Sequence, residues 1–137
     1  MTEIVPLTIS EAEFDDLPFG VIQINAGGTV LRYNTFESRL SHLAAEYVIG
    51  KNFFAEIAPC TKVANFYGRF EKARALGVVD EQFEFVFPFP HGHREVIIHI
   101  MSGLQDTYWI CIADRTADSS IRTQMKEFLG AKGVSPN

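Results

Sequence analysis

The sequence of 137 residues contains only two cysteines, Cys60 and Cys111, which lie far apart along the chain. Such a pair forms none of the short spacings that bind metal ions. Residues 1–16 lack the charged and apolar regions of a signal peptide, so the sequence gives no sign of export to an oxidising compartment. We therefore expect a cytoplasmic protein in which both thiols stay reduced.

Long hydrophobic runs and an excess of positive charge are also missing. No apolar segment is long enough to cross a bilayer, which predicts that the protein does not insert into a membrane. The net charge is −5 and no basic run or stripe occurs, which argues against a nucleic-acid surface. Hydrophobic residues make up 47% of the chain and charged residues 21%, as is typical of one folded globular domain.

Phenylalanine, in contrast, is abundant, with twelve residues. Large rings either fill a core or form the walls of a pocket for an aromatic ligand. Core packing is the simpler interpretation for most of these rings.

The first half of the chain predicts an N-terminal cap, a hairpin and several short helical turns. The AGG segment marks the hairpin turn between two strand-like runs. Thr61 is placed to cap a helix that Gly77 ends, and the apolar residues of this helix recur every three or four positions. The expected elements are a short helix at 10–16, strands at 20–25 and 29–34, helical turns at 35–48 and 52–59, and a helix at 62–76 with Val63, Phe66, Tyr67, Phe70 and Ala73 on one face.

The second half predicts three more strands and a final amphipathic helix. The strands are expected at 81–89, 94–102 and 107–114, with a turn in the PHGHR segment, and the helix at 119–130. Together these elements indicate an α+β domain with a five-stranded antiparallel sheet. We expect the helices to pack on one face of this sheet and to leave a hollow for a ligand.

Cys60 is the first candidate for chemistry, because it immediately precedes the predicted helix cap. A helix N-terminus favours a thiolate, which is a better nucleophile than a thiol toward an activated acyl group. From position alone, a small packed residue is the more common alternative. A redox sensor is a third alternative, but Cys111 lies on a predicted core strand and no resolving cysteine is evident.

Tyr33 and Glu37 form the second candidate, since they stand four positions apart where a strand passes into helical turns. Their side chains are able to converge on one point. A glutamic acid that faces an apolar interior has a raised pKa and holds its proton. The alternative, favoured by spacing alone, is that Glu37 points into water.

The four histidines are His42, His91, His93 and His99. His91 and His93 stand two apart in a turn with no third ligand nearby, which is poor evidence for a metal site. No Ser–His–carboxylate set, phosphate-binding glycine loop or paired-carboxylate motif stands out. The sequence therefore gives no argument for an enzyme.

Several segments closely resemble the photoactive yellow protein family, which comprises blue-light sensors with a PAS fold. These segments are LPFGVIQINAGGTVLRYNTFES, VIGKNFFAEIAPCT, FYGRF, FEFVF and YWICI. The resemblance covers about residues 14–115, and the GKNFF–APC block is far more specific than a general PAS pattern. It implies a PAS domain with a cap at 1–16, a photosensor core at 17–115 and a helical extension at 116–137.

The resemblance also implies a cofactor and its binding residues. Cys60 would carry p-coumaric acid (4-hydroxycinnamic acid) as a covalent thioester, and Tyr33 and Glu37 would hydrogen-bond its phenolate. In the implied mechanism, light isomerises the double bond, Glu37 transfers its proton to the phenolate, and the protein partly unfolds. Ser41 would support the tyrosine, and Phe53, Phe87 and Phe89 would line or flank the ligand.

Some positions depart from the family pattern. Leu43 stands in place of an arginine that covers the phenolate end, and His42 beside it replaces a glycine. His91 replaces a methionine that assists thermal recovery, and Phe89 replaces a tyrosine. We expect these changes to alter colour or recovery kinetics.

The resulting hypothesis is a bacterial, cytoplasmic photoreceptor without catalytic activity, which signals to an unknown downstream protein. The alternative is a PAS-type interaction module whose pocket is empty or holds another ligand. Residues 116–137 either contact a partner, such as a second subunit in a homodimer, or form a disordered end.

Overall fold

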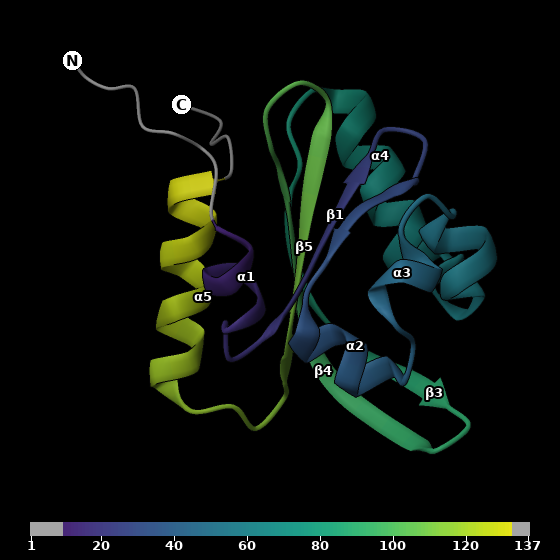
Figure 1. The fold of residues 1–137 in the computed structure, drawn as a ribbon. Helices are drawn as coiled ribbons and strands as arrows, with labels where there is room; N and C mark the ends of the chain where they lie inside the picture. The colour runs from purple at the N-terminus through teal and green to yellow at the C-terminus, as the bar shows by residue number, and fades with distance from the viewer. Residues whose placement is uncertain (1–9, 133–137) are drawn as a thin grey trace.

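A computed structural model describes residues 10–132 of the chain. At their centre is one antiparallel sheet of five strands in the order β2-β1-β5-β4-β3 (Figure 1). The predicted α+β class is therefore confirmed, and every expected strand is present with small shifts at its ends. The strands are β1 (Gly20–Asn25), β2 (Val30–Tyr33), β3 (Asp80–Phe89), β4 (Gly92–Ser102) and β5 (Thr107–Asp114).

The long β3–β4 hairpin illustrates how the sequence pattern becomes structure. Side chains alternate between the two faces of a strand, so residues two apart share a face. Phe83 and Phe87 are buried on β3, whereas the residues between them are more exposed. Pairing continues to Phe89 and Gly92, which leaves only Pro90 and His91 in the turn. The hairpin thus carries a row of rings on one face up to its tip.

Helices cover both faces of the sheet, so the expectation of helices on one face is wrong. On one side lie α1 (Glu11–Asp15) and α5 (Ser119–Lys132), and on the other lie α3 (Ala45–Val48) and α4 (Arg69–Leu76) (Figure 1). The reason lies in β5, where residues 108–113 are all buried. A strand that is apolar on both faces needs a cover on each of them.

The face under α1 and α5 has its own hydrophobic cluster, here called the second core. The ring of Phe128 on α5 meets Trp109 at a centroid distance of 5.3 Å and Phe19 at 6.1 Å. The alternative of a disordered end is therefore wrong for residues 119–132, and the homodimer through the C-terminal extension stays a prediction. The buried members of the second core are Phe14, Phe19, Val21, Met101, Trp109, Cys111, Ala113, Met125, Phe128 and Leu129.

The segment after Pro59 does not form the continuous helix predicted at 62–76. A 3₁₀ turn spans Pro59–Thr61, a π-helical turn spans Ala64–Gly68, and α4 begins only at Arg69. The predicted cap, Thr61, is buried and instead donates its hydroxyl to the carbonyl oxygen of Ala58 at 2.6 Å. Val63 is consequently exposed, although Phe66, Phe70 and Ala73 are buried as predicted.

Candidate ligand-binding site

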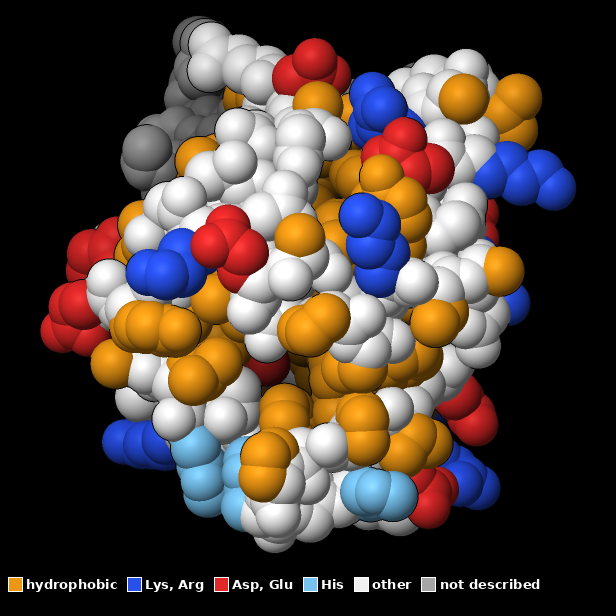
Figure 2. Space-filling model, turned by 90° about the vertical axis from the view of Figure 1, so that its right-hand side faces the viewer, with side chains coloured by type: hydrophobic (Ala, Val, Ile, Leu, Met, Phe, Trp, Pro, Cys, Tyr) orange, Lys and Arg blue, Asp and Glu red, His pale blue; other side chains and the backbone are white. Residues whose placement is uncertain are grey.

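A cavity of about 550 Å³ lies between the sheet and the helical segments on the side of α3 and α4. On this face of the molecule, hydrophobic side chains surround a hollow, with histidines below it (Figure 2). The volume is typical of small-molecule sites, which are mostly apolar with a few polar groups. The lining residues are Tyr33, Glu37, Ser41, His42, Leu43, Phe53, Ile57, Ala58, Phe87, Phe89, Pro90 and His91.

Every site residue predicted from the sequence belongs to this lining except Cys60. Ile57, Ala58 and Pro90 are lining residues that the sequence did not predict. The structure therefore brings together side chains from β2, α2 (Thr35–Ser41) and the turn after it, the π-helical turn Phe53–Ile57, β3, and the β3–β4 turn.

Glu37 reaches the cavity from α2 (Thr35–Ser41). The N-cap of this helix is Asn34, whose side chain also bonds to β1. The side-chain oxygen of Asn34 accepts the N–H of Glu37 at 3.1 Å and that of Val21 at 2.9 Å. Glu37 is only 3% exposed, so the alternative that it points into water is wrong. Within the described part of the chain, its Oε1 has no hydrogen-bond partner.

The protonation of Glu37 follows from this environment. Removing a carboxylate from water without a compensating donor disfavours the charged form. Burial accordingly raises the pKa of Glu37 from 4.5 to about 8. The residue therefore carries its proton at neutral pH and offers an O–H group to the cavity.

Tyr33 is the second buried polar side chain of the site and ends β2. Its hydroxyl donates a hydrogen bond of 2.7 Å to Oγ of Ser41, which in turn accepts the N–H of Leu43 at 3.2 Å. Burial raises the pKa of Tyr33, the nearby Glu37 raises it further, and the bond with Ser41 lowers it in part. The phenol therefore stays neutral, and a ligand oxygen in this cavity would meet two uncharged O–H groups.

A continuous stack of rings forms one wall of the cavity. Phe87 and Phe89 stack at a centroid distance of 5.2 Å, and Phe89 stacks on His91 at 4.9 Å. His91 then stacks on His42 at 3.5 Å with only 13° between the ring planes. These stacked rings give the cavity an aromatic wall against which an aromatic ligand is able to pack.

The two histidines also close one rim of the cavity. Nε2 of His91 lies 2.9 Å from the carbonyl oxygen of Leu40, and it must carry the hydrogen because a carbonyl only accepts. His42 ends α2 in the left-handed region with φ 63°, which is uncommon for a residue other than glycine. The hydrogen bond from His91 to Leu40 and the stacking of His91 on His42 both join the tip of the β3–β4 hairpin to the end of α2.

Cys60 differs from the prediction in its local structure and its chemistry. It lies inside the 3₁₀ turn Pro59–Thr61 and is half-buried against the same hydrophobic cluster that includes Phe53. Burial raises the pKa of its thiol, so the expectation of a thiolate favoured by a helix N-terminus is wrong. A three-residue turn aligns too few peptide dipoles to stabilise a thiolate. Ala58, two residues before Cys60, lines the cavity, so the sulfur lies close to it along the chain.

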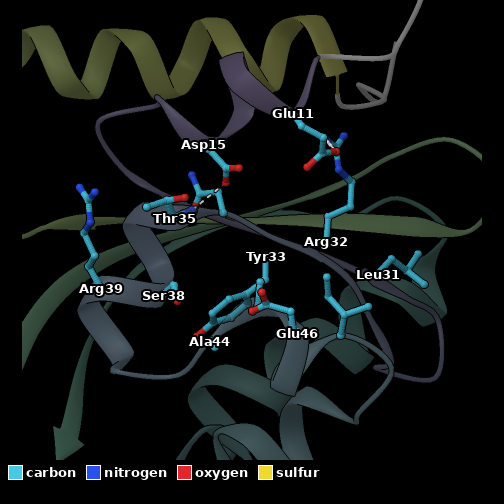
Figure 3. Close-up of a pocket in the computed structure, with 13 residues that line it drawn as sticks. Glu11, Asp15, Leu31, Arg32, Tyr33, Thr35, Ser38, Arg39, Ala44 and Glu46 are labelled. Carbon is cyan, nitrogen blue, oxygen red and sulfur yellow. Dashed lines mark hydrogen bonds and ion pairs between the residues drawn. The ribbon is translucent and has the colours of Figure 1, made fainter.

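A second hollow, of about 440 Å³, also has Tyr33 in its lining and lies among α1, β2, α2 and α3 (Figure 3). Two polar contacts link the elements around it. Arg32 contacts Glu11 at 2.8 Å, and Oδ1 of Asp15 accepts the N–H of Thr35 at 2.9 Å. These contacts tie α1 to β2 and to the start of α2, so the polar groups here hold the N-terminal helix on the domain.

Asn34 is a supporting residue of the site that the sequence analysis missed. Its side chain is fully buried and donates to the carbonyl oxygens of Phe14 at 3.2 Å and Phe19 at 3.0 Å. The available signal was an asparagine directly before a helix, which is a preferred N-cap. This side chain joins α1, β1 and α2 at one point, next to Glu37.

Two kinds of site are not found in residues 10–132. No group of three or more His, Cys, Asp or Glu side chains in this part of the chain is placed to hold a metal ion. Among the described helices, none is long and apolar enough to span a membrane.

Residues 10–113 match the PAS fold family, and the chain is accordingly a PAS domain. Within that class it belongs to the photoactive yellow protein family. It is 41% identical over 105 residues to the photoactive yellow protein of Rhodothalassium salexigens, covering 76% of this chain and 84% of that protein. The photoactive yellow protein of Halochromatium salexigens is 40% identical with the same coverage.

Solved structures agree with this assignment. The photoactive yellow protein domain of the sensor histidine kinase Ppr from Rhodospirillum centenum superposes with a TM-score of 0.76 at 45% identity. The match covers 77% of this chain and 94% of that domain. A LOV protein of Rhodobacter sphaeroides shares the fold alone, with a TM-score of 0.68 and 12% identity over 92% of this chain and 80% of that one.

Proposed function

We propose that this protein is a blue-light photoreceptor that carries p-coumaric acid as a thioester on Cys60 and has no catalytic activity of its own. The observation that carries the proposal is the buried and protonated Glu37, which lines an apolar cavity together with Tyr33. Such an arrangement is costly to keep unless a ligand uses it. The relatives named photoactive yellow protein point to the same use.

The residues present fit this cofactor. A phenolate oxygen placed near Tyr33 and Glu37 would accept hydrogen bonds from two neutral donors, and bonds to a charged acceptor are stronger than neutral ones. Phe87 and Phe89 line the cavity with aromatic rings against which its aromatic part would pack. Cys60 is half-buried against the hydrophobic cluster that includes Phe53 and Phe87, two lining residues, and would supply the nucleophilic sulfur for an activated acyl group.

When bound, the p-coumaroyl group supplies absorption of blue light and isomerisation of its double bond. The task of Glu37 is to hold a proton at its carboxyl in the dark and to release it when the hydrogen-bonded partner changes position. After that release, an ionised carboxylate would lie in a dry site without a compensating charge, which is expensive. Among residues 10–132, no lysine or arginine lines the cavity to relieve this cost.

We infer that this cost is relieved by partial unfolding that begins at the N-terminal helix. Asn34 bonds both to the backbone N–H of Glu37 and to the carbonyl oxygens of Phe14 and Phe19. A displacement of α2 by the new charge would therefore strain the bonds that hold α1. Loss of these bonds would be the signal to a downstream protein.

Reconstitution of the ligand-free protein with activated p-coumaric acid tests the proposal. The wild-type protein and Cys111→Ala are expected to form a covalent adduct with a visible absorption band, and Cys60→Ala is expected to form none. In Glu37→Gln the band is expected at longer wavelength, because a weaker donor holds the phenolate less tightly. A wild-type protein that forms no adduct would instead support the chromophore-free interaction module.

A further inference from the structure

The backbone conformation at Gly20 does not require a glycine. It is the first residue of β1, it is buried, and it has the extended conformation that any residue adopts in a strand. Its φ lies outside the left-handed region in which Gly28, Gly50, Gly77 and Gly92 are found. Glycine in a strand loses conformational entropy and packs no side chain, so its presence often marks the close approach of another group.

The group that approaches Gly20 is the side chain of Glu37. A Cβ atom added to Gly20 would fall on Oε1 of Glu37, well inside van der Waals contact. It would also lie 3.2 Å from Cδ and 3.4 Å from Cβ of the same residue. The glutamic acid therefore lies flat over the bare Cα of Gly20, and its Oε1 rests against a CH₂ group that offers no hydrogen bond.

The backbone on both sides of Gly20 is fixed to the start of α2. Asn34 donates from Nδ2 to the carbonyl oxygen of Phe19 and accepts the N–H of Val21 at Oδ1. Its own N–H donates to the carbonyl oxygen of Val21 at 3.1 Å. These bonds fix the position of the start of α2 relative to β1. They therefore also position the carboxyl of Glu37, which lies one turn after Asn34.

We propose that Gly20 is a positioning residue for Glu37: its missing side chain creates the recess that keeps the carboxyl dry and without a partner at Oε1. A methyl group in this recess would push the carboxyl toward the cavity, where water and polar groups reach it. The other titratable groups that line this cavity are Tyr33 on β2, His42 after α2 and His91 in the β3–β4 turn. The inference concerns the ligand-free chain and is therefore independent of the p-coumarate proposal.

A pH titration of the full-length, ligand-free protein tests the inference. The protonated carboxyl of Glu37 is followed by its infrared band, which Glu37→Gln identifies by removing it. We expect a midpoint near pH 8 in the wild-type protein and a midpoint at least one pH unit lower in Gly20→Ala, which is a tenfold weaker hold on the proton. Gly68→Ala is the matched control, because an added Cβ there meets nothing nearer than 3.7 Å, and its midpoint should equal that of the wild type. An unchanged midpoint in Gly20→Ala would overturn the proposal.

A double-mutant cycle covers the case in which Gly20→Ala folds poorly. Glu37→Ala vacates the recess, whereas Glu37→Gln keeps it filled. Gly20→Ala should therefore lower the folded-to-unfolded ratio at least tenfold more in the wild-type and Glu37→Gln backgrounds than in the Glu37→Ala background. An equal loss in all three backgrounds would show that the glycine serves only the strand and would refute its role toward Glu37.

Discussion

Raising the pH of the ligand-free protein is expected to destabilise the fold through Glu37. Below pH 4.5 the carboxyl is protonated in both the folded and the unfolded chain. Between pH 4.5 and about 8 the unfolded chain releases this proton while the folded chain keeps it, so the free energy of unfolding falls as pH rises. Above about pH 8 both forms are ionised and the loss reaches its limit.

The size of the effect follows from the two pKa values. Each pH unit between 4.5 and about 8 changes the free energy of unfolding by about 1.4 kcal/mol. The wild-type protein should therefore lose roughly 5 kcal/mol over this range, which is comparable to the whole stability of a small domain. Glu37→Gln keeps the shape of the side chain but does not titrate, so the difference between the two proteins isolates this one group.

Urea unfolding at several pH values measures the effect. Trp109, the single tryptophan, lies buried in the second core and reports on unfolding by its fluorescence. The stability of the wild-type protein relative to Glu37→Gln should fall steadily from pH 4.5 to 8 and then level off. Stability curves that run parallel at all pH values would refute the reasoning, because they would mean that Glu37 titrates alike in the folded and unfolded states.

Three further predictions concern the thiols, the second core and the support of α2. In the native protein, Cys60 should react with a disulfide reagent more slowly than an exposed thiol, because burial raises its pKa. Cys111 is buried and should react only after unfolding. Equal rates for the two thiols would contradict the described burial. Phe128→Ala should lower the free energy of unfolding by about 3 kcal/mol in urea titrations, and a loss near zero would mean that α5 does not pack on the sheet. Asn34→Ala should cost about 3 kcal/mol or more, since it leaves several buried backbone groups unpaired, and Asn34→Asp, which keeps the capping oxygen, should cost less.

The parts of the fold that the sequence predicted are those set by local periodicity. Phe83 and Phe87 alternate with more exposed residues on β3, and glycine marks the hairpin turn after β1, so the strands could be placed without knowledge of the tertiary structure. Burial on both faces was harder to predict. The run YWICIA at residues 108–113 is apolar without alternation, which is typical of a strand covered on both sides, but the prediction placed the helices on one face only.

The helix expected at 62–76 failed because its cap has a closer partner. A threonine before an amphipathic run is an ordinary N-cap pattern, but the hydroxyl of Thr61 bonds to Ala58 and tightens the chain into a 3₁₀ turn. This single contact also removes the helix N-terminus expected beside Cys60. A local side-chain bond of this kind competes with the helix, and a threonine at this spacing is compatible with either arrangement.

The sequence predicted most residues that line the candidate site, but not Asn34 and Gly20, which position Glu37. Tyr33, Glu37 and the rings of the wall lie together as the family resemblance implied, and their functional roles stay predictions. The contact of Glu37 with Gly20 joins two segments that are separate in the sequence, and no pattern in either segment reveals it.

Illumination of the reconstituted protein with blue light tests the central claim most directly. We predict that the visible band of the adduct on Cys60 bleaches under the light and returns in the dark, and that an infrared difference spectrum shows loss of the protonated Glu37 carboxyl during the bleached state. An adduct on Cys60 whose band does not change under blue light would contradict the claim that this protein is a photoreceptor.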